Sequence, residues 1–77
     1  MDVHLRDLRY FTAVAEELHL RKAAERLFVS QPVLSRQIAR LEQDLKARLF
    51  IRDRRSVRLT SAGEALLHRA RHLLEDW

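Results

Sequence analysis

A single glycine and a single proline occur in the 77-residue sequence, and this scarcity limits what the chain can fold into. Glycine and proline are the usual residues of tight turns and hairpins, so the chain has little material for a multi-stranded fold. Apolar residues instead recur at steps of three and four, which is the spacing along one face of an α-helix. A chain of this length supports one core. We therefore expect a small, mainly helical protein.

Two helical patterns occupy the first third of the chain. The first has an apolar stripe of Leu5, Leu8, Phe11, Val14 or Ala15, and Leu18. The second is shorter, runs around Lys22–Phe28, and places on one face Ala23, Ala24 and Leu27. Because alanine is small, this face allows a neighbouring helix to approach closely. We expect the first helix to act as scaffold and the second to pack tightly against a neighbour.

A third helix is indicated from Ser30 onward. The Ser30 hydroxyl can cap the helix, and Pro32 is tolerated in the first turn, where backbone amides lack intrahelical partners. A stripe at steps of four, three and four predicts the buried face, with Leu34, Ile38, Leu41 and Leu45. The opposite face is polar and cationic, with Gln31, Ser35, Arg36, Arg40 and Gln43.

The pattern changes after the third helix. A short apolar run at 49–51 and an alternating run at 57–59 flank an arginine-rich polar segment, which predicts a small β-hairpin. A last helix follows. Ser61 together with Glu64 fits a capping box for this helix, and Thr60 is the competing cap. Capping chemistry alone leaves both alternatives open.

The last helix is unusually rich in apolar residues. Its stripe consists of Ala62, Leu66, Ala70, Leu73 and Trp77, and it is widened by Leu67 and Leu74. This surface is wider than one small domain covers, which favours pairing with a second helix. The alternative is that Leu67 and Leu74 fold back on the domain's own core. Trp77 at the end of the chain suggests a helix that continues further.

Positive charge is concentrated in the middle of the chain. The net charge is −2 over residues 1–20, +7 over residues 21–58 and −1 over residues 59–77, which sums to the overall +4. A basic segment between slightly acidic flanks is typical of a protein that binds a polyanion. A solvated charged surface is the alternative interpretation.

The order of the predicted elements is that of a winged helix-turn-helix, in which a capped, cationic helix is followed by a β-hairpin wing. On the third helix, the amide of Gln31 suits the edge of an adenine, and Arg36 can reach a guanine or a phosphate. Ser35 is small enough to let the helix approach the groove. The hairpin carries three crowded cations, Arg52, Arg54 and Arg55. Their mutual repulsion favours an anionic partner.

The sequence resembles the N-terminal domain of LysR-type transcriptional regulators over nearly its whole length. The resembling segments are Leu8–Phe11, Val14–Glu16, Ala23–Leu27, the run VSQPVLSRQIARLE over 29–42, Arg48–Phe50, and the run VRLTSAG over 57–63. The pattern SQPxLSRQIxxLE is highly specific. The resemblance implies a third helix in the major groove of DNA, a wing at the minor groove, and a fourth helix that pairs two protomers.

Side-chain chemistry and the resemblance together assign three groups of residues. We expect base contacts from Gln31, Pro32, Ser35, Arg36 and Arg52. We expect phosphate contacts from Arg21, Lys22, Ser30, Arg40, Arg54 and Arg55. We expect a dimer interface made by Leu66, Leu67, Ala70, Leu73, Leu74 and Trp77. With the recognition helix over about 31–45 and the wing over 52–56, the protein is expected to bind an inverted-repeat operator in double-stranded DNA as a homodimer.

The expected organisation is a winged helix-turn-helix DNA-binding domain over residues 1–60 and the truncated start of a linker and dimerisation helix over residues 61–77. LysR-type regulators also carry a C-terminal effector-binding domain. The resemblance therefore implies an isolated domain or an engineered fragment, with a naturally short protein as the alternative, and an effector ligand is expected only for that further domain.

Three positions depart from the usual pattern of the family. Arg21 stands where many members cap the second helix with Thr or Ser. Lys46 stands where the third helix usually ends in glycine, and a left-handed lysine costs roughly 1 kcal/mol. Arg54 stands where the wing often has glycine. We expect either a strained Lys46 or a turn of different shape.

Other protein classes fit the sequence poorly. The chain has no cysteine for a disulfide or thiolate metal site, no signal-peptide pattern, and no apolar run of membrane-spanning length. It also lacks a glycine-rich phosphate loop and a G-x-S-x-G elbow. The hairpin lacks the aromatic residues that stack on single-stranded RNA. We expect a cytoplasmic protein that is not an enzyme and that binds no cofactor, metal or membrane.

Two alternatives are kept. The first is a helical protein-interaction module that dimerises through the last helix and has no DNA specificity. The salt dependence of DNA binding separates it from a DNA reader, because phosphate contacts weaken steeply with salt. The second is a metal site on the last helix, with candidate ligands Glu64, His68, His72 and Glu75. Residues at such helical spacing are more often part of an exposed surface.

Overall fold

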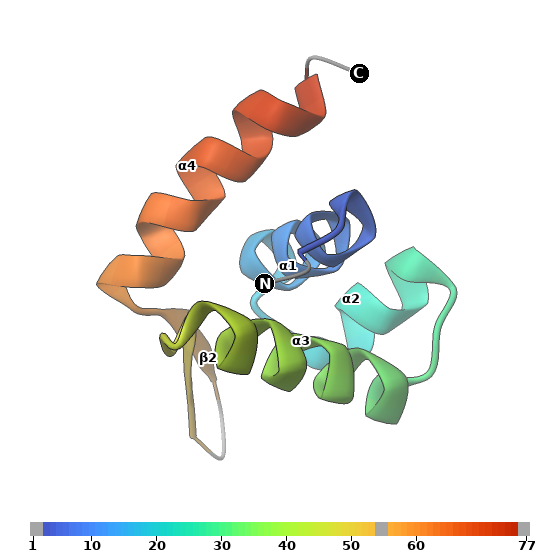
Figure 1. The fold of residues 1–77 in the computed structure, drawn as a ribbon. Helices are drawn as coiled ribbons and strands as arrows, with labels where there is room; N and C mark the ends of the chain where they lie inside the picture. The colour runs from blue at the N-terminus through green and yellow to red at the C-terminus, as the bar shows by residue number, and fades with distance from the viewer. Residues whose placement is uncertain (1–2, 54–55, 76–77) are drawn as a thin grey trace.

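The computed structural model describes residues 3–53 and 56–75 of the chain. Within these residues, four helices and two strands follow in the order α1 (Leu5–Glu17), α2 (Leu20–Leu27), α3 (Gln31–Leu45), β1 (Phe50–Arg52), β2 (Val57–Leu59) and α4 (Ser61–Glu75) (Figure 1). The expected mainly helical fold with a two-stranded wing is confirmed. Three residues with predicted roles, Arg54, Arg55 and Trp77, lie outside the described residues.

The core is formed by α1, α2 and α3 and is closed by the start of β1. Its largest fully buried side chains are Phe11, Val14, Leu34, Ile38, Leu41, Leu49 and Phe50. The rings of Phe11 in α1 and Phe50 in β1 have centroids 5.3 Å apart and are tilted by 42°. Aromatic pairs in this range stabilise a core beyond their area of burial. The wing is thus anchored in the same core as the helices.

The predicted apolar stripes of α1 and α3 supply most of this core. α3 buries three of its four stripe residues, Leu34, Ile38 and Leu41. α1 buries both Val14 and Ala15, the two alternatives for one position of its stripe. The prediction that Leu18 continues this stripe is wrong. Leu18 ends the helix in a left-handed conformation, and its side chain is 44% exposed because the chain turns there towards α2.

Three helices end on a non-glycine residue with positive φ. The residues are Leu18, Phe28 and Lys46, with φ of 51°, 58° and 54°. The backbone N–H of Lys46 donates to the carbonyl of Gln43 at 3.2 Å, which closes the last turn of α3. Lys46 therefore keeps the turn that glycine usually makes and tolerates the strain, rather than changing the shape of the turn. Phe28 is 95% exposed in the turn between α2 and α3.

The hairpin is antiparallel, with the pairs Phe50 and Leu59, Ile51 and Arg58, and Arg52 and Val57. The start of α4 then follows directly. Of the two candidate caps, the structure selects Thr60, whose Oγ1 accepts a hydrogen bond from the Gly63 N–H at 3.0 Å and donates one to the Arg48 carbonyl. Thr60 therefore caps α4 and also ties it to the segment that leads into β1.

α4 lies against α1 and extends beyond the rest of the fold towards the C-terminus (Figure 1). Ala70 is completely buried in this contact, and Leu66 and Leu67 are partly buried against the core. Leu67 thus contributes to the domain's own core. Ala62 is exposed and lies outside the buried stripe, and Leu73 is 52% exposed. In the described part of the chain, no helix is both long and apolar enough to cross a membrane.

Candidate nucleic-acid interface

α3 presents its polar side to solvent because its apolar side is held in the core. Leu34, Ile38 and Leu41 point inward, while the predicted contact residues on the other side are exposed: Gln31, Pro32, Arg36 and Arg40. Ser35, at the edge of this face, is half-buried. The predicted recognition surface is therefore a continuous exposed face of a rigid helix, with amide, hydroxyl and guanidinium groups along it.

The start of α3 is fixed by the predicted cap. Ser30 Oγ accepts a hydrogen bond from the Val33 N–H at 3.3 Å, and Pro32 occupies the first turn. A hydroxyl that accepts one hydrogen bond still has its own proton to donate, so Ser30 remains able to contact a phosphate. The positive end of the helix dipole lies at the same place, which also favours an anion there.

The cap of α2 is a residue that the sequence analysis missed. His19 Nδ1 accepts a hydrogen bond from the Lys22 N–H at 3.3 Å, so histidine does here what Thr or Ser does elsewhere. Histidine is not among the preferred capping residues, so the sequence alone did not predict His19 as the cap of α2. Arg21 lies within the helix, is exposed, and pairs with Glu25 at 3.7 Å. Lys22 is also exposed.

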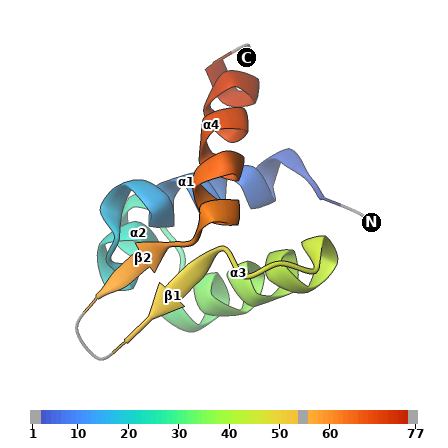
Figure 2. The same ribbon diagram turned by 90° about the vertical axis from the view of Figure 1, so that its left-hand side faces the viewer.

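The beginning of α2, the beginning of α3 and the loop end of the hairpin surround one surface pocket of about 280 Å³. Arg21 comes from α2, Gln31 from α3, and Asp53 and Ser56 from the hairpin. Figure 2 shows the hairpin projecting beside the two helices. The structure thus brings together residues from three segments that the sequence could assign only separately.

The wing is held by side chains whose role the sequence analysis did not include. Asp53 Oδ1 accepts hydrogen bonds from the Ser56 N–H at 2.8 Å and the Ser56 hydroxyl at 3.2 Å, and the Asp53 N–H donates to the Ser56 carbonyl at 3.0 Å. These bonds draw together the two ends of the segment that carries the predicted wing arginines. Arg52 is exposed at the end of β1, and Arg58, which was not predicted as a contact, is exposed on β2.

The direction of the wing is set at its other end by Glu42. Glu42 Oε2 accepts hydrogen bonds from the backbone N–H groups of Leu49 at 2.7 Å and Phe50 at 3.3 Å. A carboxylate that accepts two backbone hydrogen bonds forms stronger contacts than a neutral acceptor. The recognition helix and the first strand of the wing are therefore joined by one side chain from α3.

The candidate metal ligands on α4 do not gather into a site. His68 and His72 contact each other edge to face, with ring centroids 4.8 Å apart. Over residues 3–53 and 56–75, no three His, Asp or Glu side chains come together in an arrangement that could hold a metal ion. In the described part of the chain, these two histidines of α4 therefore contact each other and do not form part of a metal site.

The comparison with protein families agrees with this geometry. Residues 5–64 match the family model described as bacterial regulatory helix-turn-helix protein, lysR family. The chain belongs to this family. Its fold is the winged helix-turn-helix of LysR DNA-binding domains, and the function of this domain is sequence-specific DNA binding in transcription regulation.

Individual relatives show the same similarity. The chain is 57% identical over 74 residues to the uncharacterized HTH-type transcriptional regulator YnfL of Escherichia coli strain K12, and the match covers 96% of the chain and 25% of the relative. The curated relatives that it matches, such as this one, are regulators about four times as long as the matched segment.

Solved structures are similar over almost the whole chain. The complex of the CbnR DNA-binding domain with DNA is 48% identical with a TM-score of 0.91, covering 95% of this chain and 84% of that chain. The complex of the BenM DNA-binding domain with catB site 1 DNA is 44% identical with a TM-score of 0.93, covering 96% and 82%. At 44–48% identity, these structures support membership of the same family as well as the same fold.

Proposed function

We propose that this lysR-family domain reads an operator with α3 in the major groove and the wing at the adjacent minor groove. The observation that carries this proposal is the convergence of Arg21, Gln31 and the loop end of the hairpin on one exposed surface. α3 is long enough to lie along the groove, with its polar side free and its apolar side fixed in the core. The similarity to two DNA-binding domains that were solved in complex with DNA supports DNA binding by this domain.

The bases are read, in this proposal, by residues at the start of α3 and at the end of β1. The set is Gln31, Pro32, Ser35, Arg36 and Arg52. An amide offers a donor and an acceptor to adenine, and a guanidinium offers two donors to guanine. Arg52 is placed at the minor groove because a narrow, electronegative groove attracts arginine.

The phosphates are held by the flanking cations and by the cap of α3. The described members of this set are Arg21, Lys22, Ser30 and Arg40, and Arg54 and Arg55, outside the described residues, complete it. Phosphate contacts orient the protein on the duplex and carry no sequence information of their own. Their number sets how steeply binding falls with salt.

Two copies pair through α4 and place two recognition helices on an inverted repeat. Of the residues predicted for pairing, Leu73 is half exposed, Leu66, Leu67 and Leu74 keep only part of their surface exposed, and Trp77 lies outside the described residues. Ala70 was expected in this interface, but it is completely buried against the chain's own α1 and has no surface to offer a partner. Leu73, which is half exposed, is the central contact of the proposed dimer.

The chain spans about a quarter of the length of the curated relatives that it matches, so the activity of the whole protein is part of the proposal. We assign residues 1–60 to the DNA-reading unit and residues 61–77 to the start of a linker helix that leads to an effector-binding domain. A regulator of bacterial DNA works in the cytoplasm. The relatives are regulators, and the proposed surface has the chemistry of binding rather than of catalysis.

The salt dependence of binding tests the proposal against a protein-interaction module. We would measure the affinity of the chain for a fluorescent duplex pool at a series of salt concentrations. A DNA reader with several phosphate contacts gives a logarithmic slope of about −0.9 for each contact. A slope near zero, or no binding at low salt, would contradict the proposal and favour the interaction module.

A further inference from the structure

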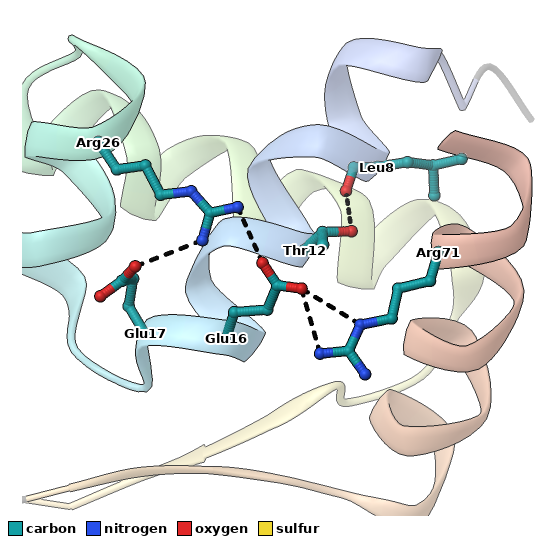
Figure 3. Close-up of polar contacts among 6 residues, drawn as sticks. All are labelled: Leu8, Thr12, Glu16, Glu17, Arg26 and Arg71. Carbon is teal, nitrogen blue, oxygen red and sulfur yellow. Dashed lines mark hydrogen bonds and ion pairs between the residues drawn. The ribbon is translucent and has the colours of Figure 1, made fainter. Parts of the chain in front are cut away.

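One carboxylate, that of Glu16 at the end of α1, contacts cations from two other helices (Figure 3). Glu16 Oε1 accepts a hydrogen bond from Arg26 Nη2 of α2 at 2.8 Å. Glu16 Oε2 accepts two from Arg71 of α4, from Nε at 3.2 Å and from Nη2 at 3.1 Å. The neighbouring Glu17 contacts Arg26 of α2, at 3.3 Å. Glu16 is therefore the common partner of α2 and α4.

Glu16 and Arg26 each favour the charged form of the other. The hydrogen bond from Arg26, followed by that from Arg71, lowers the pKa of Glu16 against an opposing effect of burial. The hydrogen bond to Glu16 in turn raises the pKa of Arg26. The Glu16 side chain is 30% exposed, so solvent screens the cluster only in part.

The contact with Arg71 has a defined direction. The Nε–H and Nη2–H groups of Arg71 both donate to the same oxygen, Glu16 Oε2, so the edge of the guanidinium faces that atom. A second cation on the same carboxylate adds order, because Glu16 is already restricted by Arg26. Arg71 is accordingly linked to α2 through Glu16.

The apolar contacts of α4 with the rest of the fold come from Leu66, Leu67 and Ala70, which precede Arg71. Ala70 is completely buried. Beyond it, Leu73 is half exposed. In the described part of the chain, Arg71 is the one side chain of α4 that hydrogen-bonds to another helix. Arg71 is thus the polar link between the outer half of α4 and the rest of the described fold.

We propose that Glu16 is a positioning residue that sets the tilt of α4 relative to α2 and α3 through Arg71, and thereby sets the operator spacing that a dimer accepts. The inference rests on the proposed pairing through α4. If α4 pairs two protomers, its tilt determines how far apart and at what angle the two recognition helices lie. A small change at Glu16 is therefore converted into a change of half-site separation.

The tilt itself is measured without DNA. Because the chain has no cysteine, the substitutions Ala39→Cys in α3 and Glu75→Cys in α4 introduce two unique, exposed sites for spin labels. Labelled chain is diluted with excess unlabelled chain, so that the measured distances lie within one protomer. We expect a narrow distance distribution for the parent and the loss of this narrow peak in Glu16→Gln and in Arg71→Met.

The matched control is Glu17→Gln, which removes an ion pair between α1 and α2 but leaves the contact with α4 intact. We expect the narrow distribution to persist in this variant. Thermal unfolding measures whether each variant is folded. Because Glu16→Gln and Arg71→Met remove different members of the same ion pair, either variant can test the proposal if the other does not fold. An unchanged distribution in both Glu16→Gln and Arg71→Met, or equal broadening in Glu17→Gln, would overturn the proposal.

The consequence for DNA is measured separately. The inverted repeat selected by the parent chain is lengthened and shortened by single base pairs at its centre, and affinity is measured for each duplex. We expect the preference for the selected spacing to fall roughly threefold to fivefold in Glu16→Gln, the range open to an exposed ion-pair cluster. A retained preference would contradict the role in spacing. If the parent itself selects no repeat, the proposed dimeric function fails, while the spin-label result still decides the tilt.

Discussion

Gly63 in α4 lies directly against the backbone of Leu49, so closely that a β-carbon at position 63 would overlap the Leu49 carbonyl oxygen. The same β-carbon would lie 2.9 Å from Leu59 Cδ2. The chain's single glycine is therefore needed for the approach of α4 to the hairpin rather than for a turn, and it has no positive φ. This contact places the start of α4 against the wing.

We expect Gly63→Ala to destabilise the fold. In an unobstructed helix this change stabilises by about 1 kcal/mol, but here the added methyl group meets backbone, which cannot move aside cheaply. We expect a net loss of roughly 1–3 kcal/mol in the free energy of unfolding, measured by urea denaturation. The control is Ala65→Gly at an exposed position of the same helix, which should cost about 1 kcal/mol. A Gly63→Ala variant as stable as the parent would show that the approach is not tight.

A substitution at Lys46 should instead increase the free energy of unfolding. Its φ of 54° is strained for a lysine, and its side chain is exposed. Glycine adopts this conformation freely, so Lys46→Gly should raise the free energy of unfolding by about 1 kcal/mol. Urea denaturation measures the change. A loss of stability would mean that the lysine side chain makes a contact that compensates for the strain.

Acid should weaken the Glu16 cluster. The folded-state pKa of Glu16 lies below its ordinary value of 4.5, so the stability that the cluster contributes is complete above that value and is lost as the pH falls through the lowered pKa. We expect the difference in unfolding free energy between the parent and Glu16→Gln to be constant near neutral pH and to shrink below the ordinary glutamate range. A difference that stays constant into strong acid would contradict this role.

Substitutions should distinguish residues that contact bases from residues that contact phosphates. Gln31→Ala removes an amide at the start of α3, and we expect a loss of roughly 1–3 kcal/mol on the preferred operator with little loss on random duplex. Arg40→Ala is the matched control for a phosphate contact. It should weaken all sequences alike and reduce the salt slope by about one unit. Affinities are measured on both duplexes at several salt concentrations. Equal losses on cognate and random DNA for Gln31→Ala would remove it from the base-reading set.

Most of the fold could be predicted from the sequence because its signals are local. The stripe of Leu34, Ile38 and Leu41 and the cap at Ser30 define α3, and the structure confirms both. The end of α1 could not be predicted in this way. Leu18 has the right spacing and type for the stripe, but the chain turns there in a left-handed conformation that nothing in its residue type favours.

The site was predicted less completely, since much of it depends on distant contacts. The cap from His19 uses a residue type that seldom caps a helix. The pocket that joins Arg21, Gln31 and Asp53 exists only once α2, α3 and the hairpin are packed together. The pair of Glu16 and Arg71 spans 55 positions of the chain, and no periodic pattern connects residues so far apart.

The most direct measurement is selection from a randomised duplex library with the purified chain at moderate salt, with sequencing of the bound DNA after several rounds. We predict enrichment of an interrupted inverted repeat by the parent and loss of this two-part site in Leu73→Asp, because a charge on the exposed part of α4 opposes pairing. Salt-sensitive binding without any enriched sequence would contradict sequence-specific reading by α3 and the wing. Enrichment of the same repeat by Leu73→Asp would contradict dimer formation through α4.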